Sequence, residues 1–135
     1  AFAMTEKVAQ ASLKPGDHGA TYGGNPLACM AVKTVIDIFE EEKIVDHVRD
    51  VASYLTERLE ELVQHVDGVL ARKGTGLMQG IVLKQPVAQV NNRAIEEGLL
   101  VIQSQGNVLR LVPPLVIEKG HVDEMIGKLT KALTA

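Results

Sequence analysis

Two places in the sequence hold residues that could bind an anion, and the first is the loop "HGATYGGNP" from His18 to Pro26. Its glycines leave the backbone N–H groups flexible, Thr21 adds a hydroxyl, and the loop runs into the start of a predicted helix. Backbone concavities and helix N-termini of this kind can hold a phosphate or another anion. Pro26 removes one of the helical donors, so a plain surface turn is the alternative interpretation.

The second candidate is Arg110, which lies in the apolar segment "VLRLV". A guanidinium in such a strand must point to water, pair with an acid or receive an anionic ligand, because burying an unpaired charge is costly. A solvent-facing arginine and an anion-binding arginine both fit the sequence pattern.

The sequence lacks the motifs of several other kinds of catalytic or binding site. The sequence contains no HExxH, no Gly-x-Ser-x-Gly and no Walker loop. The "GTGLMQG" segment misses the dinucleotide fingerprint by one residue and falls in a predicted hairpin. We expect Cys29 to be a small buried hydrophobe in a helix rather than a catalytic thiol. Four histidines lack the spacing of metal ligands, namely His18, His47, His65 and His121.

The composition is that of a globular domain of 135 residues, with 46% hydrophobic and 23% charged residues. A net charge of −3 and an aromatic content of 3% give little support to nucleic-acid binding. The single cysteine excludes an internal disulfide, and no apolar run approaches the roughly 18 residues of a membrane span. We therefore expect neither a nucleic-acid nor a membrane partner, and a cytoplasmic location; we interpret Ala1 as a cut end.

The elements that must position Thr21 come first in the chain. A short helix is expected after Thr5 in "EKVAQAS", and a longer one from Pro26 to about Glu42. Asn25 is a favoured N-cap for the second helix, since its side-chain oxygen can accept a free backbone N–H. The first turns of this helix, "LACMAV", are apolar on all sides, which predicts a helix buried between packing partners.

The elements around Arg110 follow from residue 44 onward. Apolar residues at spacings of three and four predict an amphipathic helix over 44–66. A hairpin is expected around Gly74–Gly76, a short helix between Pro86 and Gly98, and strands in 99–104 and 107–112. A last amphipathic helix carries apolar residues from 122 to 133. This order predicts a small α+β layer.

Three stretches in the same order, "GDHGATYGGNPLACMAV", "KGTGLMQGIVL" and "VLRLVPPLVI", resemble the class-III pyridoxal-phosphate aminotransferases over nearly the whole chain. The resemblance is greatest to the members that use N-acetylornithine as amino donor. It implies the C-terminal small domain of the aspartate-aminotransferase fold (pyridoxal-phosphate fold type I). That domain is of the α/β class, more narrowly α+β, with a short antiparallel sheet and helices packed on one side.

The resemblance also implies roles for two residues. Thr21 matches the threonine that reaches the phosphate of pyridoxal 5'-phosphate in the neighbouring subunit of a homodimer, and Arg110 matches the arginine that binds a substrate carboxylate. The Schiff-base lysine of the family lies upstream of the matching residues, while Lys7 and Lys14 match surface positions. We therefore expect no catalytic residue in this chain and no activity from the chain alone.

The implied organisation has three parts: a tail of the large cofactor-binding domain in 1–25, an interdomain helix in 26–42 and the small domain in 43–135. The implied reaction is amino transfer between N-acetylornithine and 2-oxoglutarate, which gives glutamate, in arginine biosynthesis. The alternatives are a related enzyme that uses ornithine, succinylornithine or 4-aminobutyrate, and a non-catalytic domain that binds anions or mediates association.

Overall fold

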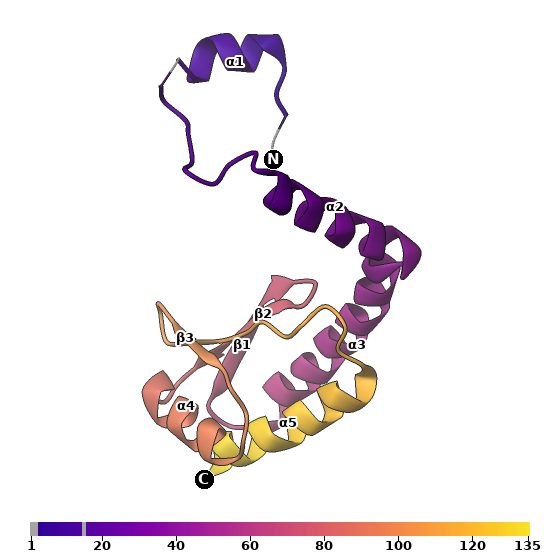
Figure 1. The fold of residues 1–135 in the computed structure, drawn as a ribbon. Coiled ribbons are helices and arrows are strands. Elements are labelled where there is room, and N and C mark those ends of the chain that lie inside the picture. The colour runs from indigo at the N-terminus through magenta and orange to yellow at the C-terminus, as the bar shows by residue number, and fades with distance from the viewer. Residues whose placement is uncertain (1–2, 15) are drawn as a thin grey trace. The chain divides into compact units, whose positions relative to one another are not determined.

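The computed structural model describes residues 3–14 and 16–135, and the chain forms two compact units, Ala1–Glu41 and Glu42–Ala135. The first unit contains α1 (Glu6–Ser12) and α2 (Pro26–Glu41), joined by a loop (Figure 1). Both helices were expected from the sequence, and α2 ends one residue earlier than predicted. The three-part domain division stays a prediction.

The N-cap predicted for α2 is confirmed. The Ala28 N–H donates to Asn25 Oδ1 at 3.0 Å, and Asn25 Nδ2 donates to the Tyr22 carbonyl at 2.6 Å. The same side chain therefore closes the loop and starts the helix, because an N-cap oxygen satisfies a donor that has no partner within the helix.

The expected burial of α2 is wrong for this chain on its own. None of the α2 residues is buried; Leu27 is 80% and Met30 is 59% exposed, and Cys29 is exposed as well. The buried role expected for Cys29 is therefore also wrong. The physical reason is that the first unit offers α2 only the seven-residue α1 and a loop as partners, and these are too small to cover an apolar helix.

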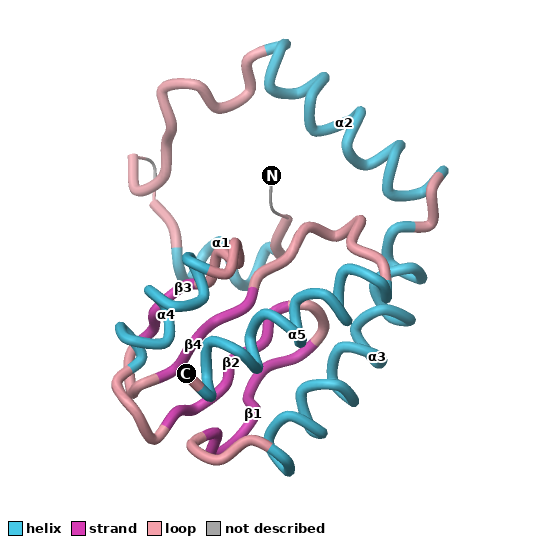
Figure 2. The backbone as a smooth tube through the Cα atoms, turned by 90° about the horizontal axis from the view of Figure 1, so that it is seen from below, coloured by secondary structure: helices cyan, strands magenta, loops and turns pink. Residues whose placement is uncertain are grey.

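The second unit is an α+β layer, as predicted (Figure 2). Its antiparallel sheet has the strand order β1-β2-β4-β3, so the hairpin β1–β2 lies beside the later pair β3–β4. Strands β3 and β4 are shorter than the segments expected from the sequence. The elements in chain order are α3 (Ile44–His65), β1 (Val69–Thr75), β2 (Met78–Leu83), α4 (Val87–Glu96), β3 (Ile102–Ser104), β4 (Val108–Leu111) and α5 (Lys119–Thr134).

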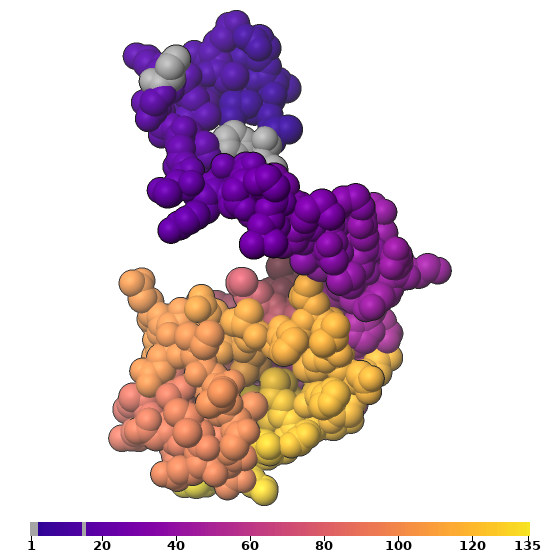
Figure 3. Space-filling view, in the orientation of Figure 1, coloured from indigo at the N-terminus to yellow at the C-terminus, as the bar shows by residue number. Residues whose placement is uncertain are grey.

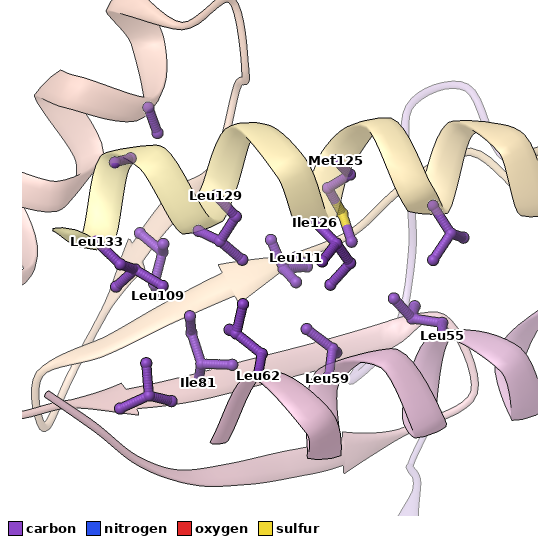
Figure 4. Packing of buried hydrophobic residues seen from close by; sticks show 14 of the residues in the cluster. Leu55, Leu59, Leu62, Ile81, Leu109, Leu111, Met125, Ile126, Leu129 and Leu133 are labelled. Carbon is purple, nitrogen blue, oxygen red and sulfur yellow. The ribbon is translucent and has the colours of Figure 1, made fainter. Parts of the chain in front are cut away.

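The hydrophobic core lies between the helices and one face of this sheet. Figure 4 shows α3 and α5 side chains pointing toward those of the strands, and the space-filling view of Figure 3 shows the outer surface of the same unit, coloured from magenta to yellow. Leu55, Leu59, Ile81, Leu109 and Leu129 are fully buried. Truncating one such leucine typically costs about 2–5 kcal/mol, so this cluster holds the sheet in place.

Asn107 connects three elements at the turn before β4. Its backbone has a φ of 59°, a left-handed conformation that asparagine tolerates better than most residues. Its carbonyl accepts the Leu83 N–H at 3.0 Å, and its Oδ1 accepts the Val87 N–H at 2.8 Å. Its Nδ2 donates to the carbonyls of Leu83 and Gln85, both at 2.6 Å. Asn107 therefore ties the end of β2 to the start of α4 and of β4.

A polar contact joins α3 to α5 outside the core. The Tyr54 hydroxyl donates to Asp123 Oδ1 at 2.7 Å, and Arg58 Nε donates to the same oxygen at 3.2 Å. The hydrogen bond to the Asp123 carboxylate, helped by partial desolvation, raises the pKa of Tyr54 above its usual value.

We expect Asn107→Ala to destabilise the fold by about 3 kcal/mol or more, since it removes three side-chain hydrogen bonds and strains a left-handed residue. Asn107→Gly removes the same bonds but accepts a positive φ, so it should be less destabilising by about 1 kcal/mol. Urea unfolding of the two variants and the parent chain measures both differences. An Asn107→Ala chain as stable as the parent would contradict this role.

The raised pKa of Tyr54 predicts a pH dependence at the alkaline end. A raised folded-state pKa stabilises the fold below the unfolded value of about 10, and this stabilisation is lost as the pH rises through the folded-state pKa. In a Tyr22→Phe background, where Tyr54 is the only tyrosine, Asp123→Asn should lower the pKa of Tyr54 measured by tyrosinate absorbance. An unchanged or higher midpoint would show that Asp123 does not cause the shift.

Candidate functional site

Arg110 lies on the face of the sheet opposite the core. It pairs with Gly80 on β2 and with Ile102 on β3, and Gly80 pairs in turn with Lys73 on β1. Residues directly opposite one another in a sheet project to the same face. Lys73 and Arg110 are both exposed, whereas the neighbours of Arg110 in the strand, Leu109 and Leu111, are buried. Two cations therefore share the outer face, one on each side of a glycine.

The glycine between them leaves a shallow depression, which we call the Arg110 hollow. It has a volume of about 150 Å³ and is lined by Lys73, Gly74, Met78, Gln79, Gly80, Val108 and Arg110. A Cβ at Gly80 would lie 2.9 Å from Val108 Cγ1, closer than real Cβ contacts. Any larger residue at position 80 would therefore displace Val108 and raise the floor of the hollow.

The charges of the hollow have no counter-ion among the residues that the structure describes. Within the described residues, neither the Lys73 ammonium nor the Arg110 guanidinium takes part in an ion pair or a side-chain hydrogen bond. Of the three environments that the sequence leaves open for Arg110, pairing with an acid is thus excluded in the described part of the chain. The Arg110 guanidinium instead faces solvent, where it is open to an anionic ligand.

A polar network supports the hollow from the core side, and sequence reasoning missed it. Gln79 is only 1% exposed; its Nε2 donates to the Gly76 carbonyl at 2.7 Å, and its Oε1 accepts Arg72 Nη1 at 3.0 Å. Arg72 also bonds Glu60 at 2.9 Å. Buried polar groups need such partners, and these bonds fix the turn from which Lys73 and Gly80 extend. The sequence signal for this network was a glutamine at a strand position that faces the core.

Thr21 lies in an exposed turn of the first unit, whereas Arg110 belongs to the second unit. Within the described residues its hydroxyl makes no hydrogen bond. Two of the helix-start donors are already used, because the Ala28 N–H donates to Asn25 Oδ1 and the Cys29 N–H donates to the Asn25 carbonyl. The Thr21 hydroxyl and the loop are therefore the main groups of this segment that fit a phosphate.

Two histidine side chains contact backbone carbonyls of the fold. His47 Nε2 contacts the Ile117 carbonyl at 2.9 Å, and His65 Nδ1 contacts the Glu61 carbonyl at 2.8 Å. In the described ranges 3–14 and 16–135, no cluster of three or more His, Cys, Asp or Glu side chains could hold a metal. Over the same ranges, no helix is long and apolar enough to cross a membrane.

Known proteins similar to this chain share both its sequence and its fold. The class-III aminotransferase family matches residues 1–133. An acetylornithine aminotransferase from Aquifex aeolicus is 45% identical over 98% of this chain and 33% of its own length. Ornithine aminotransferase 1 from Staphylococcus saprophyticus is 36% identical over 90% of this chain and 30% of its own length.

Two solved structures superpose on most of the chain. Acetylornithine aminotransferase from Elizabethkingia anophelis matches with a TM-score of 0.79 and 29% identity, over 92% of this chain and 34% of that one. Ornithine delta-aminotransferase from Plasmodium falciparum matches with a TM-score of 0.81 and 31% identity, over 90% of this chain and 32% of that one. The chain thus spans about a third of the length of the relatives that it matches. Together with the family match over nearly its whole length, these likenesses show that the chain belongs to the class-III aminotransferase family.

Proposed function

We propose that this chain is the C-terminal third of an acetylornithine aminotransferase, which transfers an amino group between N-acetylornithine and 2-oxoglutarate in arginine biosynthesis. Relatives of that name, 37–45% identical, support the choice of substrates. The observation that carries the proposal is the position of Arg110: an exposed, unpaired guanidinium in an open hollow of the sheet. We place the enzyme in the cytoplasm as a homodimer.

In this proposal Arg110 binds and orients a substrate carboxylate. A guanidinium offers parallel N–H donors in a fixed plane, which match the two oxygens of a carboxylate. Both N-acetylornithine and 2-oxoglutarate carry a carboxylate, and each substrate uses the site in turn. The rigid β4 strand, paired on both sides, keeps the Arg110 backbone fixed while the ligands exchange.

Members of this family depend on pyridoxal 5'-phosphate, which, when bound, supplies the electron sink for charge that develops at the reacting carbon. The part of this chain that would hold it is Thr21, whose hydroxyl is free to donate to a phosphate oxygen. We propose that Thr21 serves the cofactor of the neighbouring subunit. Its role is to retain the cofactor rather than to move protons.

A second candidate is ornithine transamination. The similarity to ornithine aminotransferases, in sequence and in structure, favours it as the alternative. A comparison of the specificity constants for ornithine and N-acetylornithine in a full-length protein containing this chain distinguishes the two. The roles proposed for Thr21 and Arg110 are the same in both.

In the full-length protein, Thr21→Val should weaken retention of pyridoxal phosphate by about tenfold or more. The change keeps the side-chain shape but removes a hydrogen bond to a charged group, worth roughly 1.5–3 kcal/mol. Thr5→Val is the matched control, because Thr5 is exposed and its side chain makes no capping bond. The cofactor dissociation constants of the three proteins decide the question, and equal values would make Thr21 only a turn residue.

Arg110→Lys should depress kcat/KM for both N-acetylornithine and 2-oxoglutarate, since an ammonium cannot form the two parallel bonds of a guanidinium. Arg110→Ala should lower both further, by more than about tenfold, which corresponds to roughly 1.4 kcal/mol. Arg49→Ala, at an exposed arginine on α3, is the control and should leave both unchanged. Parent values for both substrates in Arg110→Ala would end the carboxylate assignment.

A further inference from the structure

We propose that His121 is a pH-sensitive cap of α5, which anchors the connection between β4 and α5 only while its Nδ1 carries no proton. The cap acts on a single peptide group, the one that joins Ile117 to Glu118. The carbonyl oxygen of this group lies 2.9 Å from His47 Nε2 on α3, and its N–H donates to His121 Nδ1 on α5 at 3.1 Å. Two imidazoles from different helices therefore hold one peptide from its two sides.

The two contacts require different protonation states of the two rings. A carbonyl oxygen only accepts, so His47 Nε2 must carry a hydrogen, as it does in the imidazolium and in one neutral tautomer. A backbone N–H only donates, so His121 Nδ1 must present its lone pair, which it has only in the neutral ring with the hydrogen on Nε2. A fall in pH can therefore leave the His47 contact intact while it removes the acceptor of the Glu118 N–H.

The position of His121 in the helix adds to the cost of a proton there. His121 is the third residue of α5, and Glu118 is the N-cap. Free N–H groups and the helix dipole make this end of a helix positive, so a cation in the first turn is unfavourable. The common capping box has Glu or Gln at this position, whose side-chain oxygen accepts the N-cap N–H. Histidine supplies such an acceptor in only one of its charge states.

The connection that this cap anchors makes few other hydrogen bonds. Residues 113–117 follow β4 and begin with two prolines, which have no N–H. In the described part of the chain, their hydrogen bonds outside the strands are the one from the Ile117 N–H to the Pro114 carbonyl at 3.2 Å and the His47 contact. Val116 is 64% exposed, and an open apolar hollow of about 340 Å³ lies beside the connection (Figure 1). Segments with so few bonds open locally at low cost.

Charged groups around the cap act in both directions. Glu124 lies near His121, since its pKa is lowered mainly by a hydrogen bond from Lys128 and also by the charge of His121. The carboxylates of Glu118 and Glu124 favour the imidazolium, so they oppose the helix dipole and help His121 to take up a proton. The connection 113–117 contributes no titratable side chain. The charged and titratable side chains of α3 at this end are His47 and Asp50, of which Asp50 is paired with Lys119 at 2.9 Å.

The test compares the parent chain with His121→Gln, which keeps an acceptor for the N-cap N–H but does not titrate between about pH 8 and about pH 5. Solvent exchange of the Glu118 amide, measured by NMR on isotope-labelled chain and corrected for the intrinsic rate, reports the bond. In the parent, protection of this amide should fall by about fivefold at the lower pH, the loss of one exposed hydrogen bond. In His121→Gln it should change little, and in His121→Ala it should be low at both pH values.

Two further variants show which histidine responds to pH. His47→Gln can still donate to the Ile117 carbonyl and should keep the pH dependence of the parent. His65→Gln, at an exposed histidine of α3 whose ring contacts a carbonyl, is the matched control and should keep it as well.

The nitrogen chemical shifts of the His121 ring give a second readout. They should place its hydrogen on Nε2 at the higher pH, and their titration should follow the loss of Glu118 protection. Glu118 protection that is independent of pH in the parent, or that falls equally in His121→Gln, would overturn the role of His121.

Discussion

The candidate site depends on the register in which β2 pairs with β4. That register sets Gly80 opposite Arg110, and the pairing with β1 adds Lys73 to the same row. Asn107 fixes it at one end, because its carbonyl and its side chain bind both the N–H and the carbonyl of Leu83. A shift by one residue would turn Arg110 into the core and expose Leu109 or Leu111, so the buried face and the charged face specify each other.

The same register gives adjacent residues of β2 different roles. Gln79 and Ile81 face the core, where Gln79 holds the turn at Gly76, and Gly80 faces outward and forms the floor of the hollow. The polar network around Gln79 holds the hairpin in one geometry, and among its described groups Arg72 Nε is buried without a hydrogen-bond partner. The hydrogen bonds on the core face of the hairpin thus support the hollow on its outer face.

Patterns read from a single segment predicted most of the fold. The apolar spacing of α3, the Asn25 cap and the glycine turn of the hairpin each depend on neighbours in the sequence, and each is confirmed. The burial of α2 and of Cys29 could not be predicted this way, because it depends on which partners the chain provides. The place of Lys73 in the same row as Arg110 could not be predicted for the same reason, since only the pairing of three strands creates it.

The most direct test of the account is a crystal structure of the full-length protein, with its cofactor and 2-oxoglutarate bound. The account predicts that the Arg110 guanidinium lies about 3 Å from both oxygens of one carboxylate. A structure in which both carboxylates bind residues outside this chain, while Arg110 faces solvent, would contradict it.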